Sequence, residues 1–397
     1  MRFRPPPSIG LPARRLRSLL QGIGPLLCLA AVLLPGCASH PAPAASITPT
    51  PAGPRLEPAS GAYFGVNLDF GNDSAAAFNE RIGHKAAVYV QFVQFPLDAA
   101  ATKTLDDFIA QVKSQHGMGM ITLEPNNGLD TVTPDAATDL AERAAAYNAE
   151  GVPLFIRFAH EMNGSWYAWS QQPAAYASAF RLVAEAVHKA ASQTAMVWAP
   201  NYGGGYPFAG GLYEAKPGSP DFAVLDTNHD GQLSMADDPY LPYYPGDDAV
   251  DWVGMSVYHW GNQYPWLENE VPEPGKFLAI ITGNYNGLNG DERAVPDFYT
   301  VYAAGHHKPM AITETAALYN TTRPDDAELA IKQAWWDQVF APDVAKDYPQ
   351  IKMINWFEWR KSETEVGGAT IDWRATSTPA LTQAFRAALP AWLVFAK

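Results

Sequence analysis

The sequence predicts an α/β fold, a (β/α)8 TIM barrel that forms a single domain over residues 61–397. The chain has 397 residues, of which 47% are hydrophobic and 17% charged, which is enough apolar material for a large core. From residue 61 onward, strand-like apolar runs alternate with amphipathic helical patterns. The strand-like runs number eight, as this kind of barrel requires.

The expected elements follow one another in regular alternation. The strands are expected at Tyr63–Leu68, Ala86–Gln94, Met118–Leu123, Pro153–Phe158, Ala195–Ala199, Trp252–Tyr258, Met310–Glu314 and Lys352–Phe357. Helical patterns between them include Leu105–Gln115, Pro134–Ala149, Ala174–Ala191 and Asp325–Val339. In such a barrel the functional side chains gather at the C-terminal ends of the strands.

Residues 1–37 have the pattern of an export signal. An arginine-rich segment, Arg14–Arg17, precedes an apolar run over about residues 23–34, which is too short to cross a bilayer core of about 30 Å. The run ends in Leu34-Pro35-Gly36-Cys37, which resembles a bacterial lipobox and predicts lipidation of Cys37. The alternative is ordinary cleavage just after Ala38. We therefore expect an exported protein, either a lipoprotein of the cell envelope or a secreted one.

Residues 38–60 are rich in Pro and Ala and are expected to form an extended linker, because such a segment cannot build a core. Both cysteines, Cys28 and Cys37, precede this linker. No disulfide can therefore support the exported domain.

The charge balance restricts the partners. The net charge is −14, and five arginines lie within the first 37 residues, so the remainder is more acidic still. An acidic surface repels phosphate backbones and anionic lipids. We expect a neutral substrate, no nucleic acid, a monomer, and membrane contact only through a lipid anchor.

Two carboxylates follow expected strands. Glu161 comes just after the fourth strand, in the segment Arg157–Trp169, and Glu314 ends the seventh. Strict alternation would place Arg157 on the same side as Glu161, and Met310 and Ile312 on the same side as Glu314. Two carboxylates among aromatic side chains are what glycoside cleavage needs, one as acid and one as base or nucleophile.

Four motifs occur in order along the chain: Arg157–Trp169 (RFAHEMNGSWYAW), Tyr244–Asp248 leading to Val250–Gly254, Ile312-Thr313-Glu314, and Trp356-Phe357 followed by Asp372-Trp373-Arg374. In these motifs the chain resembles glycoside hydrolase family 26, a group of clan A barrels that includes β-mannanases and mixed-linkage β-glucanases. The resemblance implies that Glu161 is the acid/base and Glu314 the nucleophile. It also implies that four side chains line the subsite of the attacked sugar, namely His160, Trp166, Tyr258 and Trp356.

Some of these residues also have structural interpretations. Arg157 could touch sugar, or it could orient Glu161 or a neighbouring acid, and His160 could donate to a backbone carbonyl. The loop after the sixth strand holds Tyr258, Trp260, Tyr264 and Trp266. This aromatic density exceeds what packing alone needs, so we expect these rings, Trp260 included, to stack on sugar faces.

A second motif lies outside the catalytic strands. Residues Asp226–Asp237 (DTNHDGQLSMAD) match the twelve-residue EF-hand-like calcium loop, with Gly at its sixth position. The expected ligand positions are Asp226, Asn228, Asp230, Gln232 and Asp237. We expect a structural Ca²⁺ and no cofactor for catalysis, against the alternative of an ordinary Asp/Asn/Gly turn.

The sequence thus predicts a retaining endo-β-glycanase that hydrolyses β-1,4-mannan through a two-carboxylate double displacement. Alternatives are an endo-β-1,3-1,4-glucanase, an enzyme that trims an envelope exopolysaccharide, and a non-catalytic glycan-binding lipoprotein. Mannan and glucan differ in the orientation of one hydroxyl group of each sugar. The loops that would distinguish the two orientations have no periodic pattern in the sequence that predicts their conformation.

Overall fold

The computed structural model describes residues 56–397. The expected signal peptide over residues 1–37, the lipidation site Cys37 and most of the expected linker lie outside the described residues. Within residues 56–397, no helix is long and apolar enough to cross a membrane.

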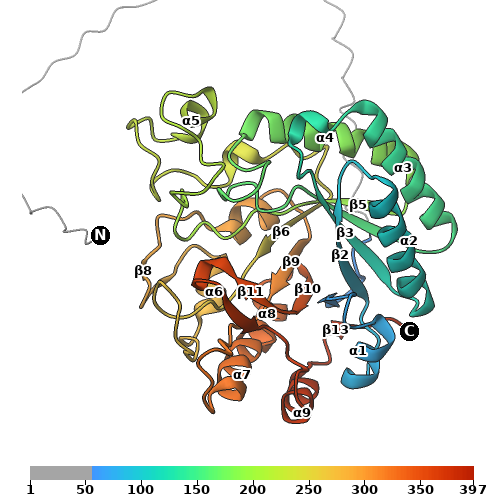
Figure 1. Cartoon of the computed structure of the whole chain (residues 1–397), viewed down its shortest axis with the longest axis vertical. Helices are drawn as coiled ribbons and strands as arrows, with labels where there is room; N and C mark the ends of the chain where they lie inside the picture. The colour runs from blue at the N-terminus through green and yellow to red at the C-terminus, as the bar shows by residue number, and fades with distance from the viewer. Residues whose placement is uncertain (1–55) are drawn as a thin grey trace, which may run out of the picture. The chain divides into compact units, whose positions relative to one another are not determined.

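Eight parallel strands form a closed barrel (Figure 1). In chain order they are β1 (Ala62–Leu68), β2 (Val88–Gln94), β3 (Met118–Glu124), β4 (Leu154–Phe158), β5 (Thr194–Trp198), β6 (Trp252–Ser256), β9 (Met310–Thr315) and β10 (Ile351–Glu358). Each strand pairs with the next, and β10 closes the ring by pairing with β1. The predicted (β/α)8 barrel is confirmed, and each expected strand matches within about two residues at either end.

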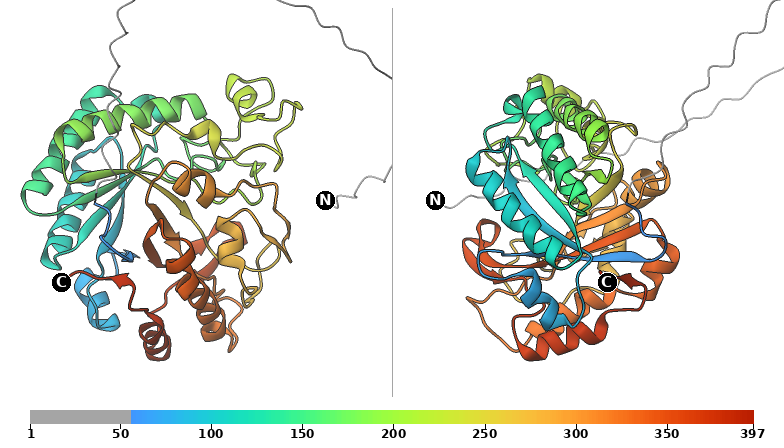
Figure 2. Two further views of the ribbon diagram at one scale, coloured as in Figure 1. Left: turned by 180° about the vertical axis from the view of Figure 1, so that it is seen from behind. Right: turned by 90° about the vertical axis from the view of Figure 1, so that its right-hand side faces the viewer.

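Helices surround this barrel, as the two views of Figure 2 show. They are α1 (Ala75–Ile82), α2 (Ala99–Ser114), α3 (Pro134–Ala149), α4 (Pro173–Ala190), α5 (Pro220–Leu225), α6 (Lys276–Ile281), α7 (Glu328–Val339), α8 (Pro342–Asp347) and α9 (Pro379–Ala388). Several begin at a side chain that accepts a hydrogen bond from the first turn, namely Ser74, Asp98, Thr133 and Thr378. Such caps satisfy backbone N–H groups that the helix leaves unpaired.

Short elements extend the loops. They are the antiparallel pairs β7 (Asn286–Gly287) with β8 (Gly290–Asp291) and β11 (Arg360–Glu363) with β12 (Ala369–Asp372), the strand β13 (Leu393–Val394) beside β1, and single helical turns at Leu129–Thr131, Leu241–Tyr243, Tyr299–Ala304 and Thr364–Val366. The connection from β6 to β9 carries β7 and β8, and the segment after β10 carries β11 and β12. Both hairpins are therefore additions to the plain alternation of strand and helix.

The core has two layers, because successive side chains of a strand point to opposite sides. Side chains such as Phe155, Trp252 and Met353 fill the barrel interior. A larger cluster packs between the barrel and the helices, and includes Trp335 and Trp336 of α7. Apolar side chains fill both layers of the core, and polar side chains lie at the C-terminal ends of the strands.

Candidate active site

Glu314 is held by two donors at the C-terminal end of β9. The guanidinium of Arg157 pairs with Oε1 of Glu314, and the Tyr258 hydroxyl donates a hydrogen bond of 2.6 Å to Oε2. Arg157 also donates to Oγ of Ser256 at 2.8 Å. These bonds fix the orientation of the carboxylate, and hydrogen bonds to a charged partner are the stronger kind.

The path of β9 differs from strict alternation. Met310 and Ile312 pack outward against the helices, whereas Glu314 lines the cleft, so the expectation that the three share a face is wrong. The pairing of β6 with β9 shifts by one residue at Thr313. An extra residue of this kind forms a β-bulge, which re-aims the side chain that follows it.

Glu161 lies in the turn that follows β4 and also lines the cleft. Its φ of 54° is in the left-handed region, which costs a residue other than glycine of order 1–3 kcal/mol. The backbone N–H of Glu161 donates to the carbonyl of Ala199 at 2.9 Å, and the Trp169 ring N–H donates to the carbonyl of His160 at 2.7 Å. These bonds anchor the turn and hold the strained residue in place.

Burial and the charge of Glu314 raise the pKa of Glu161 to about 7. The positive charge of Arg157 and a hydrogen bond with Ser256 act in the opposite direction. Glu161 is therefore protonated at mildly acidic pH. A carboxyl that keeps its proton beside one held by two donors is the arrangement of an acid/base with a nucleophile.

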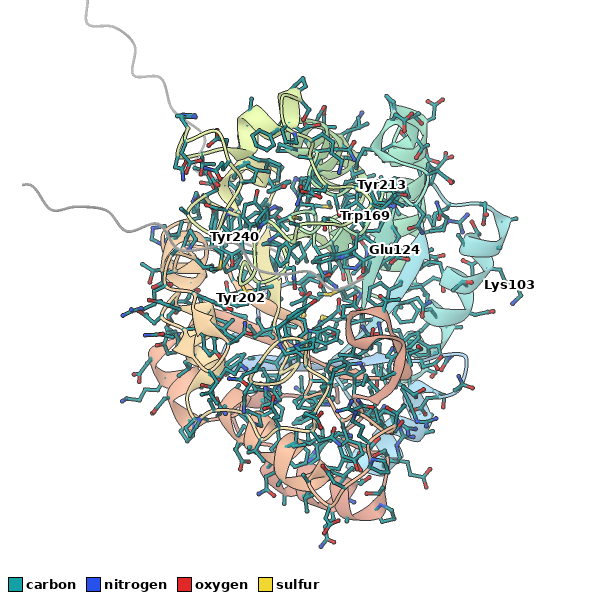
Figure 3. All side chains as sticks on the ribbon, turned by 60° about the vertical axis from the view of Figure 1, so that its left-hand side comes forward. Lys103, Glu124, Trp169, Tyr202, Tyr213 and Tyr240 are labelled. Carbon is teal, nitrogen blue, oxygen red and sulfur yellow. The ribbon has the colours of Figure 1, made fainter. Side chains whose placement is uncertain are left out.

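A third carboxyl, Glu124, lies in the same cleft and was not predicted (Figure 3). Burial, followed by the charge of Glu314, raises its pKa to about 7. Glu124 is the last residue of β3. The signal that pointed to Glu161, a carboxylate at the end of a barrel strand, was therefore present here as well.

The cleft has a volume of about 950 Å³ and crosses the mouth of the barrel. Among its predicted lining residues, His160, Trp166, Tyr258 and Trp260 are in place. Burial and the charge of Arg157 lower the pKa of His160, so its ring is neutral. Further aromatic side chains line the cleft beyond those predicted: Phe92, Tyr167, Tyr202, Phe208, Tyr285, Phe357, Trp359 and Trp373.

The aromatic loop after β6 forms a continuous row of rings. The ring centroids of Tyr258 and Trp260 are 6.1 Å apart, and those of Trp260 and Trp266 are 5.8 Å apart. Tyr264 stands edge-on to Trp266 at 5.2 Å and has 72% of its surface exposed. The row leads from the side chain bonded to Glu314 out to solvent, which suits an extended sugar chain.

The prediction for Trp356 is wrong. Its side chain is fully buried and packs outward against Trp336, Phe340 and Phe385, between the barrel and the helices. Because side chains alternate along β10, the next residue, Phe357, lines the cleft instead.

Arg157 takes the orienting role of the two alternatives. Its side chain is completely buried beneath the cleft, and its partners are Glu314 and Ser256. The expectation that it binds substrate directly is therefore wrong, because its side chain is fully buried and is not among those that line the cleft.

In the predicted calcium loop, carboxylate oxygens bind backbone N–H groups of the loop itself. Asp226 accepts from Asp230 and Gly231 at 3.1 and 2.9 Å, and Asp237 accepts from Thr227 and Ser234, both at 2.8 Å. Over the described part of the chain, no three His, Cys, Asp or Glu side chains are grouped so as to hold a metal ion. The calcium loop stays a prediction from the sequence.

Comparison with known proteins bears on the family. The sequence model of glycosyl hydrolase family 26 matches residues 100–216, which include Glu161. Endoglucanase H of Acetivibrio thermocellus is 24% identical over 324 residues, which are 79% of this chain and 29% of the relative. These matches support glycoside hydrolase family 26. The chain spans less than a third of the length of this relative.

Two solved structures of family 26 proteins are similar in fold to this chain. A modular endo-β-1,4-mannanase from Cellulomonas fimi has a TM-score of 0.54 at 19% identity, over 85% of this chain and 72% of the other. GH26C from Muricauda sp. MAR_2010_75 has a TM-score of 0.54 at 13% identity, over 85% and 87%. At these identities the two structures show the shared barrel fold.

Proposed function

We propose that this chain is a retaining endo-β-glycanase that hydrolyses β-1,4-mannan. The observation that carries the proposal is the contrast between two carboxyl groups in one cleft. Glu314 is oriented by Arg157 and Tyr258, whereas the pKa of Glu161 is raised to about 7. One group is thus prepared to attack and the other to donate a proton.

In the first step, Glu161 gives its proton to the glycosidic oxygen while Glu314 attacks the anomeric carbon. The bond to the leaving sugar breaks, and an ester forms between Glu314 and the sugar that stays. In the second step, Glu161 takes a proton from water, and the water oxygen displaces Glu314 with net retention.

The change of role follows from the electrostatics of the pair. The negative charge of Glu314 is one of the two causes that raise the pKa of Glu161. An ester at Glu314 carries no charge, so this cause disappears in the intermediate and the pKa of Glu161 falls. Glu161 is then a better base at the moment when a base is required.

The substrate class is supported by the open cleft and by the comparisons. A row of aromatic rings and a cleft across the whole barrel mouth suit a polymer bound on both sides of the broken bond. The similarity to the mannanase of C. fimi favours mannan, and the similarity to Endoglucanase H keeps a glucan as the alternative.

The test is hydrolysis of a panel of purified β-glycans, with reducing ends measured against time and the product anomer followed by NMR. Mannan oligosaccharides released with retained configuration would support the proposal. Release from mixed-linkage glucan alone would favour the glucanase alternative. Tight binding without hydrolysis of any polymer would favour the glycan-binding lipoprotein.

We also propose that the protein is a monomer, is exported and is anchored through Cys37. Metabolic labelling with a fatty acid should mark the wild type and not Cys37→Ala. If Cys37→Ala were labelled as strongly as the wild type, the proposed lipid anchor at Cys37 would be contradicted.

A further inference from the structure

A buried carboxylate that the mechanism does not use lies in the connection between β6 and β9. Glu292 follows the β7–β8 hairpin, is only 5% exposed, and lines the cleft. Tyr202 donates to its Oε2 at 2.8 Å, and Asn289 donates to its Oε1 at 2.8 Å. A carboxylate can accept about four hydrogen bonds, so each oxygen keeps capacity for one more.

Within residues 56–397, no salt bridge of 4.0 Å or less includes Glu292, and the nearby ammonium of Lys276 interacts with it electrostatically from further away. A buried charge that lacks a direct ionic contact is costly unless its hydrogen bonds are complete. The two unused acceptor positions at the cleft wall therefore favour a ligand that carries hydroxyl groups.

A donor lines the same part of the cleft. Lys276 is 6% exposed, and its ammonium donates to the carbonyl of Gly261 at 2.7 Å and lies 3.8 Å from Oε2 of Glu273. An ammonium has three hydrogens. Two of them are taken by Gly261 and Glu273, and the ammonium also lies 5.3 Å from the centre of the Tyr285 ring, which lines the cleft as well. Acceptors and a donor therefore share one wall.

The lack of a side chain at Gly204 leaves room for the carboxylate of Glu292 and the ring of Tyr202. A Cβ atom at Gly204 would lie 2.3 Å from Oε2 of Glu292 and 2.4 Å from the ring of Tyr202. Any side chain at Gly204 would therefore displace the carboxylate. Gly204 itself lines the cleft.

The order of the strands shows where Glu292 lies relative to the catalytic pair, Glu161 and Glu314. Glu292 and Tyr202 belong to the connections that follow β6 and β5, whereas Glu124 ends β3 and Lys361 follows β10. In the view of Figure 3, Tyr202 lies to the left of Glu124. The cleft contains all four residues. A bound polymer would therefore pass the catalytic pair on its way from one side to the other.

We propose that Glu292, with Lys276, forms a subsite at the β5–β6 end of the cleft that binds hydroxyl groups of a backbone sugar other than the sugar under attack. This inference rests on the proposed glycanase function. It adds a residue that determines where the polymer sits, and so which bond is cut.

The test compares Glu292→Gln with wild type on a ladder of β-1,4-linked manno- and gluco-oligosaccharides of two to six sugars. Glutamine keeps the shape and removes the charge. For the longest substrate cleaved, kcat/KM should fall about tenfold to a hundredfold, as for loss of hydrogen bonds to a charged group. The disaccharide, or an activated aryl glycoside, should be cleaved at the wild-type rate.

The pattern of cleavage gives a second readout. With hydrolysis in ¹⁸O-labelled water, mass spectrometry of the products reports which bond of the hexasaccharide is cut. That distribution should shift in Glu292→Gln, which general damage to the fold would not cause. Asp291→Asn is the matched control, because Asp291 is a neighbour that pairs on the surface with Arg293 at 2.6 Å.

An equal loss on short and long substrates, or an unchanged cleavage pattern, would overturn the subsite. Wild-type inactivity on every glycan would instead overturn the proposed function. In that event, retardation in gels that contain each polymer still compares wild type with Glu292→Gln. Equal retardation of the two would then reject the subsite independently.

Discussion

The hydroxyl group of Tyr258 lies 2.6 Å from Oε2 of Glu314, on the oxygen that Arg157 leaves free. The tyrosine belongs to the loop after β6 and the glutamate to β9, the next strand of the barrel. The loop that begins the aromatic row therefore also sets the position of the Glu314 carboxylate.

Replacing Tyr258 by Phe should lower kcat about tenfold to a hundredfold, because the ring stays and one hydrogen bond to a charged carboxylate is lost. Steady-state kinetics on the cleaved polysaccharide would measure this. Tyr213→Phe, at an exposed position that does not line the cleft, is the control and should leave kcat unchanged. Equal effects of the two variants would show that the hydroxyl of Tyr258 has no special role.

Glu314→Ala should abolish hydrolysis, because no group remains to form the covalent intermediate. Azide should restore turnover of an activated aryl glycoside and give a product of inverted configuration. If the variant kept more than about a tenth of the wild-type rate on polysaccharide, Glu314 would not be the nucleophile.

Glu161→Ala should lose about 10²- to 10⁴-fold on polysaccharide, the usual value of general acid catalysis. Substrates with good leaving groups need little protonation and should still form the intermediate quickly. A burst of leaving group followed by slow turnover would be the expected time course. Equal losses on good and poor leaving groups would contradict the assignment.

The pH dependence of kcat/KM should show a decline above about pH 7. The pKa of Glu161 is raised to about 7, so the proton that it must donate is lost as the pH rises through this value. The decline should be absent from Glu161→Gln assayed on a good leaving group. A wild-type rate that stayed level to pH 9 would exclude Glu161 as the acid.

Glu124→Gln should raise the melting temperature at pH 8 by at least about 2 °C and leave it nearly unchanged at pH 4. The folded pKa of Glu124 is raised from 4.5 to about 7, so the folded state holds the proton more tightly than the unfolded chain. The Glu124 carboxyl group therefore contributes favourably to folding stability at low pH, and this contribution is lost as the pH rises between these two pKa values. Scanning calorimetry at both pH values would test the sign.

Chelation should lower the melting temperature if Asp226–Asp237 hold Ca²⁺. An ion that binds only the folded state adds roughly 2.7 kcal/mol to the free energy of unfolding when its concentration is about 100 times its dissociation constant. Activity at low temperature should persist, because Glu161 and Glu314 lie outside this loop. If a chelator and Asp230→Ala both left the melting temperature unchanged, the loop would be an ordinary turn.

The barrel could be predicted from the sequence because each strand is a compact apolar run, and the ends of those runs located Glu161 and Glu314. One error arose where side-chain direction was counted by twos, because the bulge at Thr313 changes the count in β9. The other came from the family resemblance, which implied a subsite role for Trp356, whereas Trp356 falls on the outer face of β10. Neither is visible in a pattern of apolar residues.

Glu292 could not be found in the same way, because it follows a short hairpin with no strand periodicity around it. Its partners Tyr202 and Asn289 come from two different connections. Only the folded chain brings them together. Long loops therefore limit what the sequence reveals about specificity more than what it reveals about chemistry.

The bulge in β9 makes the direction of the Glu314 side chain depend on the length of the chain in this strand. The inward turn of Glu314 comes from one additional backbone unit at Thr313. A single-residue deletion at that position would restore plain alternation and turn the carboxylate towards the helices. In divergent copies of this barrel, a gap of one residue in this strand would therefore mark loss of activity even where the glutamate itself is retained.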